Sequence, residues 1–124
     1  MVNKYLKGYR GERNLVHLLS QKGYMVVRTP HSGSISLASP DIIAAKDGKL
    51  IVIECKAREG AFTMTPEQLE ELKQWETRGG AIPYVGWKLA RKKWAFLKVD
   101  DVLRNNGHIG KKFALEKGID IDQI

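Results

Sequence analysis

The chain has 124 residues, 43% of them hydrophobic, which suits one ordinary domain with a single core. Lys and Arg total 21 against 14 Asp and Glu, and the formal charge of +7 favours a polyanionic partner, although ribosomal and membrane-surface proteins share that balance. A single cysteine, Cys55, excludes a disulfide framework or a zinc knuckle within the chain, and no apolar run reaches the roughly 18 residues that span a bilayer. We therefore expect one cytoplasmic domain over residues 1–124.

The first predicted elements are a helix, a strand and a loop. Leu and Val recur at helical spacing in residues 11–22, and Gly23 supplies the end of the helix. Residues 24–29 predict a strand, and residues 30–40, rich in Ser, Gly and Pro, predict a loop.

Four further strands and a short helix are predicted from apolar, β-branched runs bounded by turn residues. In chain order they cover about 41–46, 50–57, 81–89, 92–99 and, for the helix, 100–105. The dipeptide Asp47-Gly48 strongly favours a tight hairpin between the first two of these strands. No pattern assigns the residues after 105.

A longer helix between the hairpin and the last two strands has complete end signals. Thr65 is its expected N-cap, Pro66 takes the first helical position, and Gln68 completes a capping box. Gly79-Gly80 ends the helix. The order of helix, three strands, helix and two strands predicts an α/β fold with a mixed sheet.

A two-residue turn fixes which residues face each other across the hairpin. Lys46 then faces Lys49, and in the same register Asp41 faces Glu54, with Cβ atoms roughly 4.5 to 5.5 Å apart. A three-residue turn would instead set Asp41 opposite Cys55. The inference that two carboxylates meet therefore depends on the turn.

The facing carboxylates predict a metal site. They repel each other unless one takes up a proton or a cation lies between them, and hard oxygen ligands without a His or Cys cluster favour Mg²⁺ or Mn²⁺ over zinc. Lys56 lies on the same face as Glu54, whereas Cys55 points to the other face. A lysine there would hold a scissile phosphate or orient the attacking water. The alternative is a salt bridge between Lys56 and one acid, with the other acid solvated.

The first helix supplies a third carboxylate. At about 100° per residue, Glu12 falls at the centre of the apolar stripe, so it would complete the metal site from the side. A simple preference for negative charge at a helix N-terminus is the alternative. Arg13 would project toward substrate, and His17, on the polar side, is expected to be solvated.

The pattern of Pro40-Asp41, then Glu54-Cys55-Lys56, with Glu12 upstream, resembles the PD-(D/E)xK nucleases. A closer resemblance, over most of residues 8–98, is to the archaeal Holliday junction resolvases, and it is carried by GERNLVHLLSQKGYMVVRTPHSGS, PDIIAAKDGKLIVIECKAR and RGGAIPYVGWKL. The resemblance implies a restriction-endonuclease-like fold, with a mixed central sheet of about five strands flanked by helices. It also implies a homodimer that cuts four-way DNA junctions with Mg²⁺, or with Mn²⁺ as a substitute, in homologous recombination and repair.

The same resemblance implies roles for individual residues. Asp41 and Glu54 would be metal ligands, joined by the backbone carbonyl of Cys55, and Glu12 would be a metal-site or water-orienting carboxylate. Lys56 would be the catalytic lysine.

Further residues match the family outside this group. Ser32, in the predicted loop, matches a serine that contributes to cleavage, although Ser-Gly clusters usually only make loops. Trp75 is a candidate for the dimer interface, with core packing as the alternative. Arg13, Arg28 and Lys88 match basic residues that contact DNA in the family. Arg91 and Lys92 lie in a basic turn that is expected to contact a DNA arm, with a simple solvated loop as the alternative.

Three functions follow from these patterns. The first is a junction resolvase. The second is another PD-(D/E)xK nuclease, acting on duplex or damaged DNA, which the small size and missing target-recognition domain disfavour. The third is a non-catalytic junction- or duplex-binding protein, which the intact set of Asp41, Glu54 and Lys56 disfavours.

Overall fold

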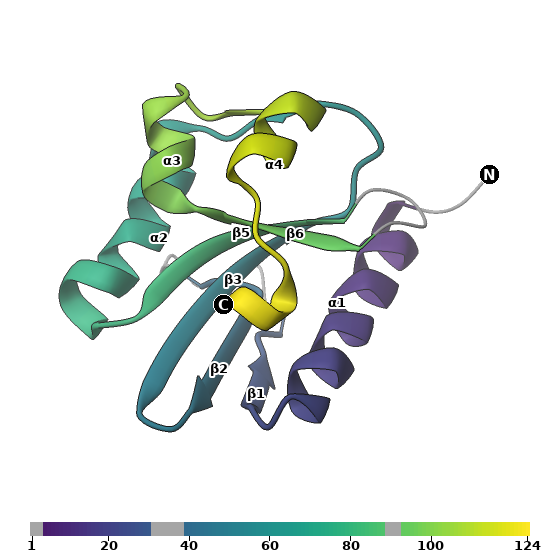
Figure 1. The fold of residues 1–124 in the computed structure, drawn as a ribbon, viewed down its shortest axis with the longest axis vertical. Helices are drawn as coiled ribbons and strands as arrows, with labels where there is room; N and C mark the ends of the chain where they lie inside the picture. Colours follow the sequence, from purple (N-terminus) through teal and green to yellow (C-terminus); the bar gives the residue numbers. More distant parts are fainter. Residues whose placement is uncertain (1–3, 31–38, 89–92) are drawn as a thin grey trace.

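A five-stranded mixed sheet, with strand order β1-β2-β3-β5-β6, forms the centre of the fold. The computed structural model describes residues 4–30, 39–88 and 93–124, with the side chains of residues 4–10 left undescribed. The helix α1 covers one face of the sheet, and α2 and α3 cover the other (Figure 1). The elements are α1 (Lys4–Gln21), β1 (Met25–Arg28), β2 (Ile42–Lys46), β3 (Lys49–Lys56), β4 (Phe62–Thr63), α2 (Pro66–Gly79), β5 (Ile82–Lys88), β6 (Trp94–Lys98), α3 (Val99–Arg104), β7 (His108–Ile109), α4 (Lys111–Lys117) and the 3₁₀ helix η1 (Ile121–Gln123).

The predicted hairpin is confirmed with its two-residue turn. Asp47 and Gly48 have φ values of 50° and 78°, the paired positive values of a type I′ turn, and Lys46 pairs with Lys49. The strand β3 then lies at the middle of the sheet, antiparallel to β2 and parallel to β5. A strand covered on both faces is expected to be apolar throughout, and Ile51 to Ile53 are fully buried.

The end signals of α2 are confirmed. The Thr65 hydroxyl accepts a hydrogen bond from the Gln68 N–H at 3.1 Å, and the Gln68 side chain accepts one from the Thr65 N–H at 3.0 Å. Gly80 ends the helix in the left-handed conformation, with φ of 71°. The caps fix where α2 begins and ends, and the helix packs over β5.

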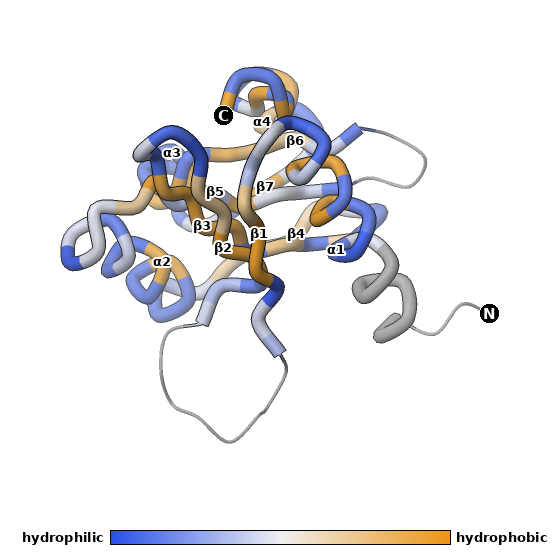
Figure 2. The backbone as a smooth tube through the Cα atoms, turned by 90° about the horizontal axis from the view of Figure 1, so that it is seen from below, coloured by the Kyte–Doolittle hydropathy of each residue, from blue (hydrophilic) through white to orange (hydrophobic). Residues whose placement is uncertain are grey.

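Two hydrophobic clusters fill the layers on either side of the sheet, and Figure 2 shows hydrophobic strands in the interior. Leu15 and Leu19 of α1 pack on one face, and Leu69 and Leu72 of α2 pack on the other. Within the described segments, no helix is long and apolar enough to cross a membrane.

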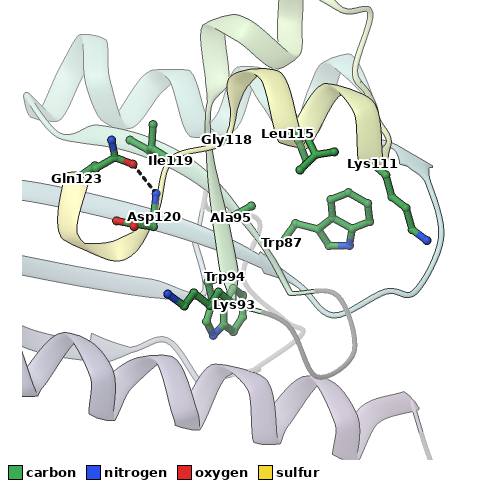
Figure 3. Close-up of a pocket in the computed structure, with 11 residues that line it drawn as sticks. Trp87, Lys93, Trp94, Ala95, Lys111, Leu115, Gly118, Ile119, Asp120 and Gln123 are labelled. Carbon is green, nitrogen blue, oxygen red and sulfur yellow. Dashed lines mark hydrogen bonds between the residues drawn. The ribbon is translucent and has the colours of Figure 1, made fainter.

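The C-terminal residues, which no sequence pattern assigned, wrap around the outer strand β6. Ile119 and Phe96 exchange two backbone hydrogen bonds, of 2.8 and 2.9 Å. The strands β4 and β7 have two residues each and form a second sheet, and such short strands show no periodicity. A cavity of about 450 Å³ lies between α4, β6 and the C-terminal turn (Figure 3).

Candidate active site

Asp41 and Glu54 meet at one end of the β2–β3 pair. Ile42 lies opposite Ile53, so Asp41, the residue just before β2, comes to Glu54, the next residue of β3, as the two-residue turn predicted. The backbone carbonyl of Asp41 accepts a hydrogen bond of 2.9 Å from the N–H of Thr29, which holds it against the end of β1. The Asp41 carboxyl group is close enough to Glu54 to raise its pKa by charge and by hydrogen bonding.

Burial and charge make this pair costly to ionise fully. Burial, together with the charge and hydrogen bonding of the neighbouring Asp41 carboxylate and the charge of Glu12, raises the pKa of Glu54 to about 8, while the Lys56 ammonium opposes the increase. A proton therefore stays on Glu54 at neutral pH in the metal-free protein.

The salt bridge that stood as the alternative is formed in part. Lys56 Nζ lies 3.9 Å from Glu54 Oε2. The other acid, however, is not left to solvent: an Asp41 carboxylate oxygen accepts a hydrogen bond of 2.7 Å from the backbone N–H of Cys55. Both acids are therefore held in place beside the lysine.

The Cys55 side chain points to the opposite face, as the strand periodicity predicted. It packs against the cluster under α1. Burial raises the pKa of the Cys55 thiol well above its usual value, and the nearby Asp41 and Glu12 carboxylates raise it further. The thiol therefore stays neutral, and the backbone of this residue is what reaches the acidic pair.

Glu12 lies on the inner face of α1, as predicted. It is 7% exposed, and its Oε1 accepts a hydrogen bond of 3.4 Å from Arg28 Nε on β1. Sequence reasoning assigned both residues but did not pair them. In the described parts of the chain, no three His, Cys, Asp or Glu side chains gather as a metal-binding group. The Glu12 carboxylate is nevertheless near enough to add to the raised pKa of Glu54.

A cavity of about 130 Å³ opens beside Glu54. Its lining residues are Ser39, Pro40, Glu54, Gln68, Glu71, Leu72 and Trp75. Sequence reasoning did not place Gln68 and Glu71 at this cavity, although their spacing from Trp75 puts all three on one face of a helix. Trp75, the predicted interface residue, is half-buried at this wall.

The remaining predicted residues lie around the pair or outside the described residues. Arg13 is exposed on α1, and His17 is also exposed, as expected. Lys88 ends β5, one residue after Trp87, which pairs with Lys56, so Lys88 and Lys56 lie at the same end of the sheet. The predictions for Ser32, Arg91 and Lys92 fall outside the residues that the structure describes.

Known proteins match this chain over nearly its whole length. The family model for archaeal Holliday junction resolvases (Hjc) matches residues 3–124. A crossover junction endodeoxyribonuclease Hjc of Sulfolobus acidocaldarius is 35% identical, over 100% of this chain and 89% of that protein. One from Archaeoglobus fulgidus is 32% identical, over 91% of this chain and 81% of that protein.

Solved structures agree with the sequence matches. The structure of Archaeoglobus fulgidus Hjc, described as a Holliday junction resolvase from an archaeal hyperthermophile, superposes with a TM-score of 0.82 at 30% identity, covering 92% of this chain and 94% of that one. The resemblance drawn from the sequence and the predicted mixed sheet are both confirmed. This chain belongs to the archaeal Holliday junction resolvase (Hjc) family.

Proposed function

We propose that this protein is a structure-selective endodeoxyribonuclease that resolves four-way DNA junctions by paired, Mg²⁺-dependent hydrolysis of phosphodiesters in recombination and repair. Family membership supports junction DNA as the substrate and a divalent metal as the cofactor. The observation that carries the proposal is the contact between the Asp41 and Glu54 carboxyl groups beside the Lys56 ammonium.

The acidic pair suits a divalent cation. Asp41, Glu54 and the backbone carbonyl of Cys55 would hold it, because they are hard oxygen donors of the kind that Mg²⁺ and Mn²⁺ prefer. A cation at the pair would also remove the repulsion that helps to raise the pKa of Glu54. Such an ion supplies polarisation of the phosphodiester and activation of a water molecule.

The chain's own residues would bind and orient the DNA strand. Lys56, whose ammonium lies 3.9 Å from Glu54, would donate to a non-bridging oxygen of the scissile phosphate and offset its charge. The Cys55 N–H fixes the direction of the Asp41 carboxylate. Glu12, through its ion pair with Arg28, would position that guanidinium for a phosphate, and Ser32 is proposed to assist cleavage.

DNA binding would be mainly electrostatic. The formal charge of +7 and the exposed Arg13 support contacts to phosphates, which carry no sequence information. Lys88, Arg91 and Lys92 are proposed to extend these contacts along an arm of the junction. Affinity should therefore fall steeply as salt concentration rises.

A homodimer is part of the proposal, because a junction close to two-fold symmetry needs two symmetric cuts. Met25 and Val27 of β1 are 78% and 61% exposed. Val27 lies opposite Ile43 in the sheet, and Ile43 lies opposite Val52, so these side chains share the face of Glu54, two residues further along β3. An apolar surface on that face supports pairing with a second copy.

The test compares labelled four-way, Y-shaped and linear DNA, each with Mg²⁺ or with EDTA. We expect paired nicks in the four-way junction only, and only with Mg²⁺. Equal cutting of linear duplex would favour a general duplex nuclease, and tight junction binding without any cutting would favour a non-catalytic binding protein.

A matched pair of variants then tests the site. Glu54→Gln should reduce cutting at least about 100-fold, because it removes a carboxylate ligand, while junction affinity stays within about tenfold. Glu70→Gln, an exposed change on α2, should leave both unchanged. Normal cutting by Glu54→Gln refutes the proposed site.

A further inference from the structure

A second cavity lies at the same end of the sheet, on the face covered by α1. It has a volume of about 230 Å³ and is bounded by α1, the end of β5, the start of β6 and the C-terminal turn. Its polar lining from the sheet and α1 consists of Lys88, Lys93, Trp94 and Asn14. Lys88 follows Trp87, the partner of Lys56 in the sheet. The cavity is therefore near the strand end that carries the proposed catalytic lysine.

Trp94 is the unusual residue of this cavity. Its ring extends from β6 toward α1 (Figure 3), it is 5% exposed, and a Cβ at Gly11 of α1 would lie 3.7 Å from its ring. Its indole nitrogen is the one buried side-chain polar atom, within the described residues, that has no hydrogen-bond partner. By contrast, the Trp87 indole donates to the Arg58 carbonyl at 2.9 Å.

An unpaired buried N–H destabilises the folded state, because it has lost its hydrogen bond to water and gained no other. Folded proteins rarely leave one without a reason. An acceptor that entered the cavity would remove this cost. The nearest charges favour an anionic acceptor, because Lys88 Nζ lies 5.8 Å from the centre of the Trp94 ring and Lys93 also lines the cavity.

Two carboxylates on the C-terminal wall do not cancel these cations. Asp122 forms an ion pair with Lys22, and Asp120 accepts a hydrogen bond of 2.9 Å from the Asp122 N–H at the start of η1. Lys88 and Lys93 therefore face two lining carboxylates, but Asp122 is already paired with Lys22, which lies outside the lining. The donors of Lys88, Lys93 and Trp94 thus point to a negatively charged ligand.

We infer that this cavity binds a backbone phosphate of a junction strand, with the Trp94 indole N–H and the Lys88 and Lys93 ammonium groups as donors. The inference rests on the proposed function, which supplies the DNA. Its chemistry is that of phosphate in general, so inorganic phosphate is the simplest probe. It also gives the C-terminal turn a role, because Asp120 and Asp122 close one wall of the cavity.

Binding measurements test the donors one at a time. The dissociation constant of a four-way junction is measured in EDTA at several salt concentrations. Lys93→Gln should reduce the slope of log K against log salt by about 1, as expected for one lost phosphate contact. Trp94→Phe, which removes the neutral N–H, should weaken binding about 3- to 10-fold without changing the slope. Lys98→Gln, at the other, exposed end of β6, is the matched control and should change neither.

An NMR measurement on the unaltered protein avoids any effect of mutation on folding. The chain has 3 tryptophans, and the Trp94→Phe spectrum assigns the Trp94 indole N–H resonance. Junction DNA should move this resonance downfield as the N–H gains an acceptor, and millimolar inorganic phosphate should move it in the same direction. The Trp87 N–H, already bonded to a carbonyl, is the internal reference for the phosphate titration.

The outcomes separate this inference from the proposed function. Wild-type protein that neither binds nor cuts the junction refutes the function. Wild-type protein that binds and cuts, with a Trp94 resonance unmoved at saturation and Lys93→Gln identical to Lys98→Gln, refutes the phosphate site alone. A response to junction DNA but not to inorganic phosphate supports a site that needs the rest of the strand.

Discussion

At the scale of single residues, the site consists of charges in positions where folding alone would favour aliphatic side chains. Glu12 is 7% exposed, and Glu54 is buried enough that its pKa rises to about 8. Burial of a charge costs free energy unless a partner compensates it, and Arg28 and Lys56 compensate only in part. Stability is therefore given up at these positions for the sake of the proposed chemistry.

The raised pKa of Glu54 predicts a pH-dependent stability. Burial and Asp41 raise this pKa to about 8, so the folded protein holds a proton that the unfolded chain loses near its ordinary, lower pKa. Stability should therefore fall as pH rises toward 8 in EDTA. Glu54→Gln removes this loss, and its free energy of unfolding should exceed that of the wild type by roughly 1 to 3 kcal/mol at pH 8.5.

Thermal unfolding at pH 5.5 and pH 8.5 measures this difference. The melting temperature of Glu54→Gln should exceed that of the wild type by more at pH 8.5 than at pH 5.5. This difference should shrink when Mg²⁺ replaces EDTA, because only the wild type keeps the full metal site. An equal difference at both pH values would show that Glu54 ionises normally.

At the scale of the elements, a turn of two residues decides where the carboxylates meet. Both Asp47 and Gly48 have positive φ, and this turn sets the register that continues to Ile42 and Ile53. A shift of one residue would move Glu54 to the face under α1. The hairpin thus sets the register that brings Asp41 to Glu54.

A second element depends on one glycine. Gly107 lies in the turn that joins α3 to β7, and β7 pairs with β4. Its φ is 82°, and a Cβ there would lie 2.3 Å from the carbonyl oxygen of Met64. Gly107→Ala should destabilise the protein by roughly 2 kcal/mol or more. Gly60→Ala, where nothing lies within 4 Å, should be nearly neutral, and urea unfolding of both variants checks the contrast.

At the scale of the whole molecule, one sheet face bears both the proposed catalytic pair and an apolar surface. The helix α2 packs over β5 and β3, whereas Met25 and Val27 on β1 remain exposed. Such a face is an expected site of association. Pairing there would put two active sites in one particle of about twice the charge, which suits a symmetric junction.

Val27→Asp should break the proposed dimer. A charge on the apolar face would have to be desolvated on pairing, so sedimentation should show monomers at concentrations where the wild type is dimeric, and paired cutting should be lost. Leu115→Asp, a change at a leucine that is 87% exposed on α4, should leave the dimer intact. A wild type that sediments as a monomer would contradict the prediction.

The sequence by itself determined the features whose causes lie within a few residues. The positive φ of Asp47 and Gly48, the capping box of Thr65 and Gln68, and strand periodicity are local, so the hairpin, α2 and the facing pair were predictable. Burial of Glu12 followed from helical periodicity in the same way.

Only the tertiary structure decided which distant segments meet. The pairing of Glu12 with Arg28 and the unpaired indole of Trp94 depend on packing between elements, and no local pattern specifies them. The two-residue strands β4 and β7 are stable only because each has the other as a partner. Local hydrogen bonds and dihedral preferences depend on neighbouring residues, so a short stretch of sequence predicts them. Contacts across the fold depend on how whole surfaces pack together, and a short stretch of sequence does not specify that packing.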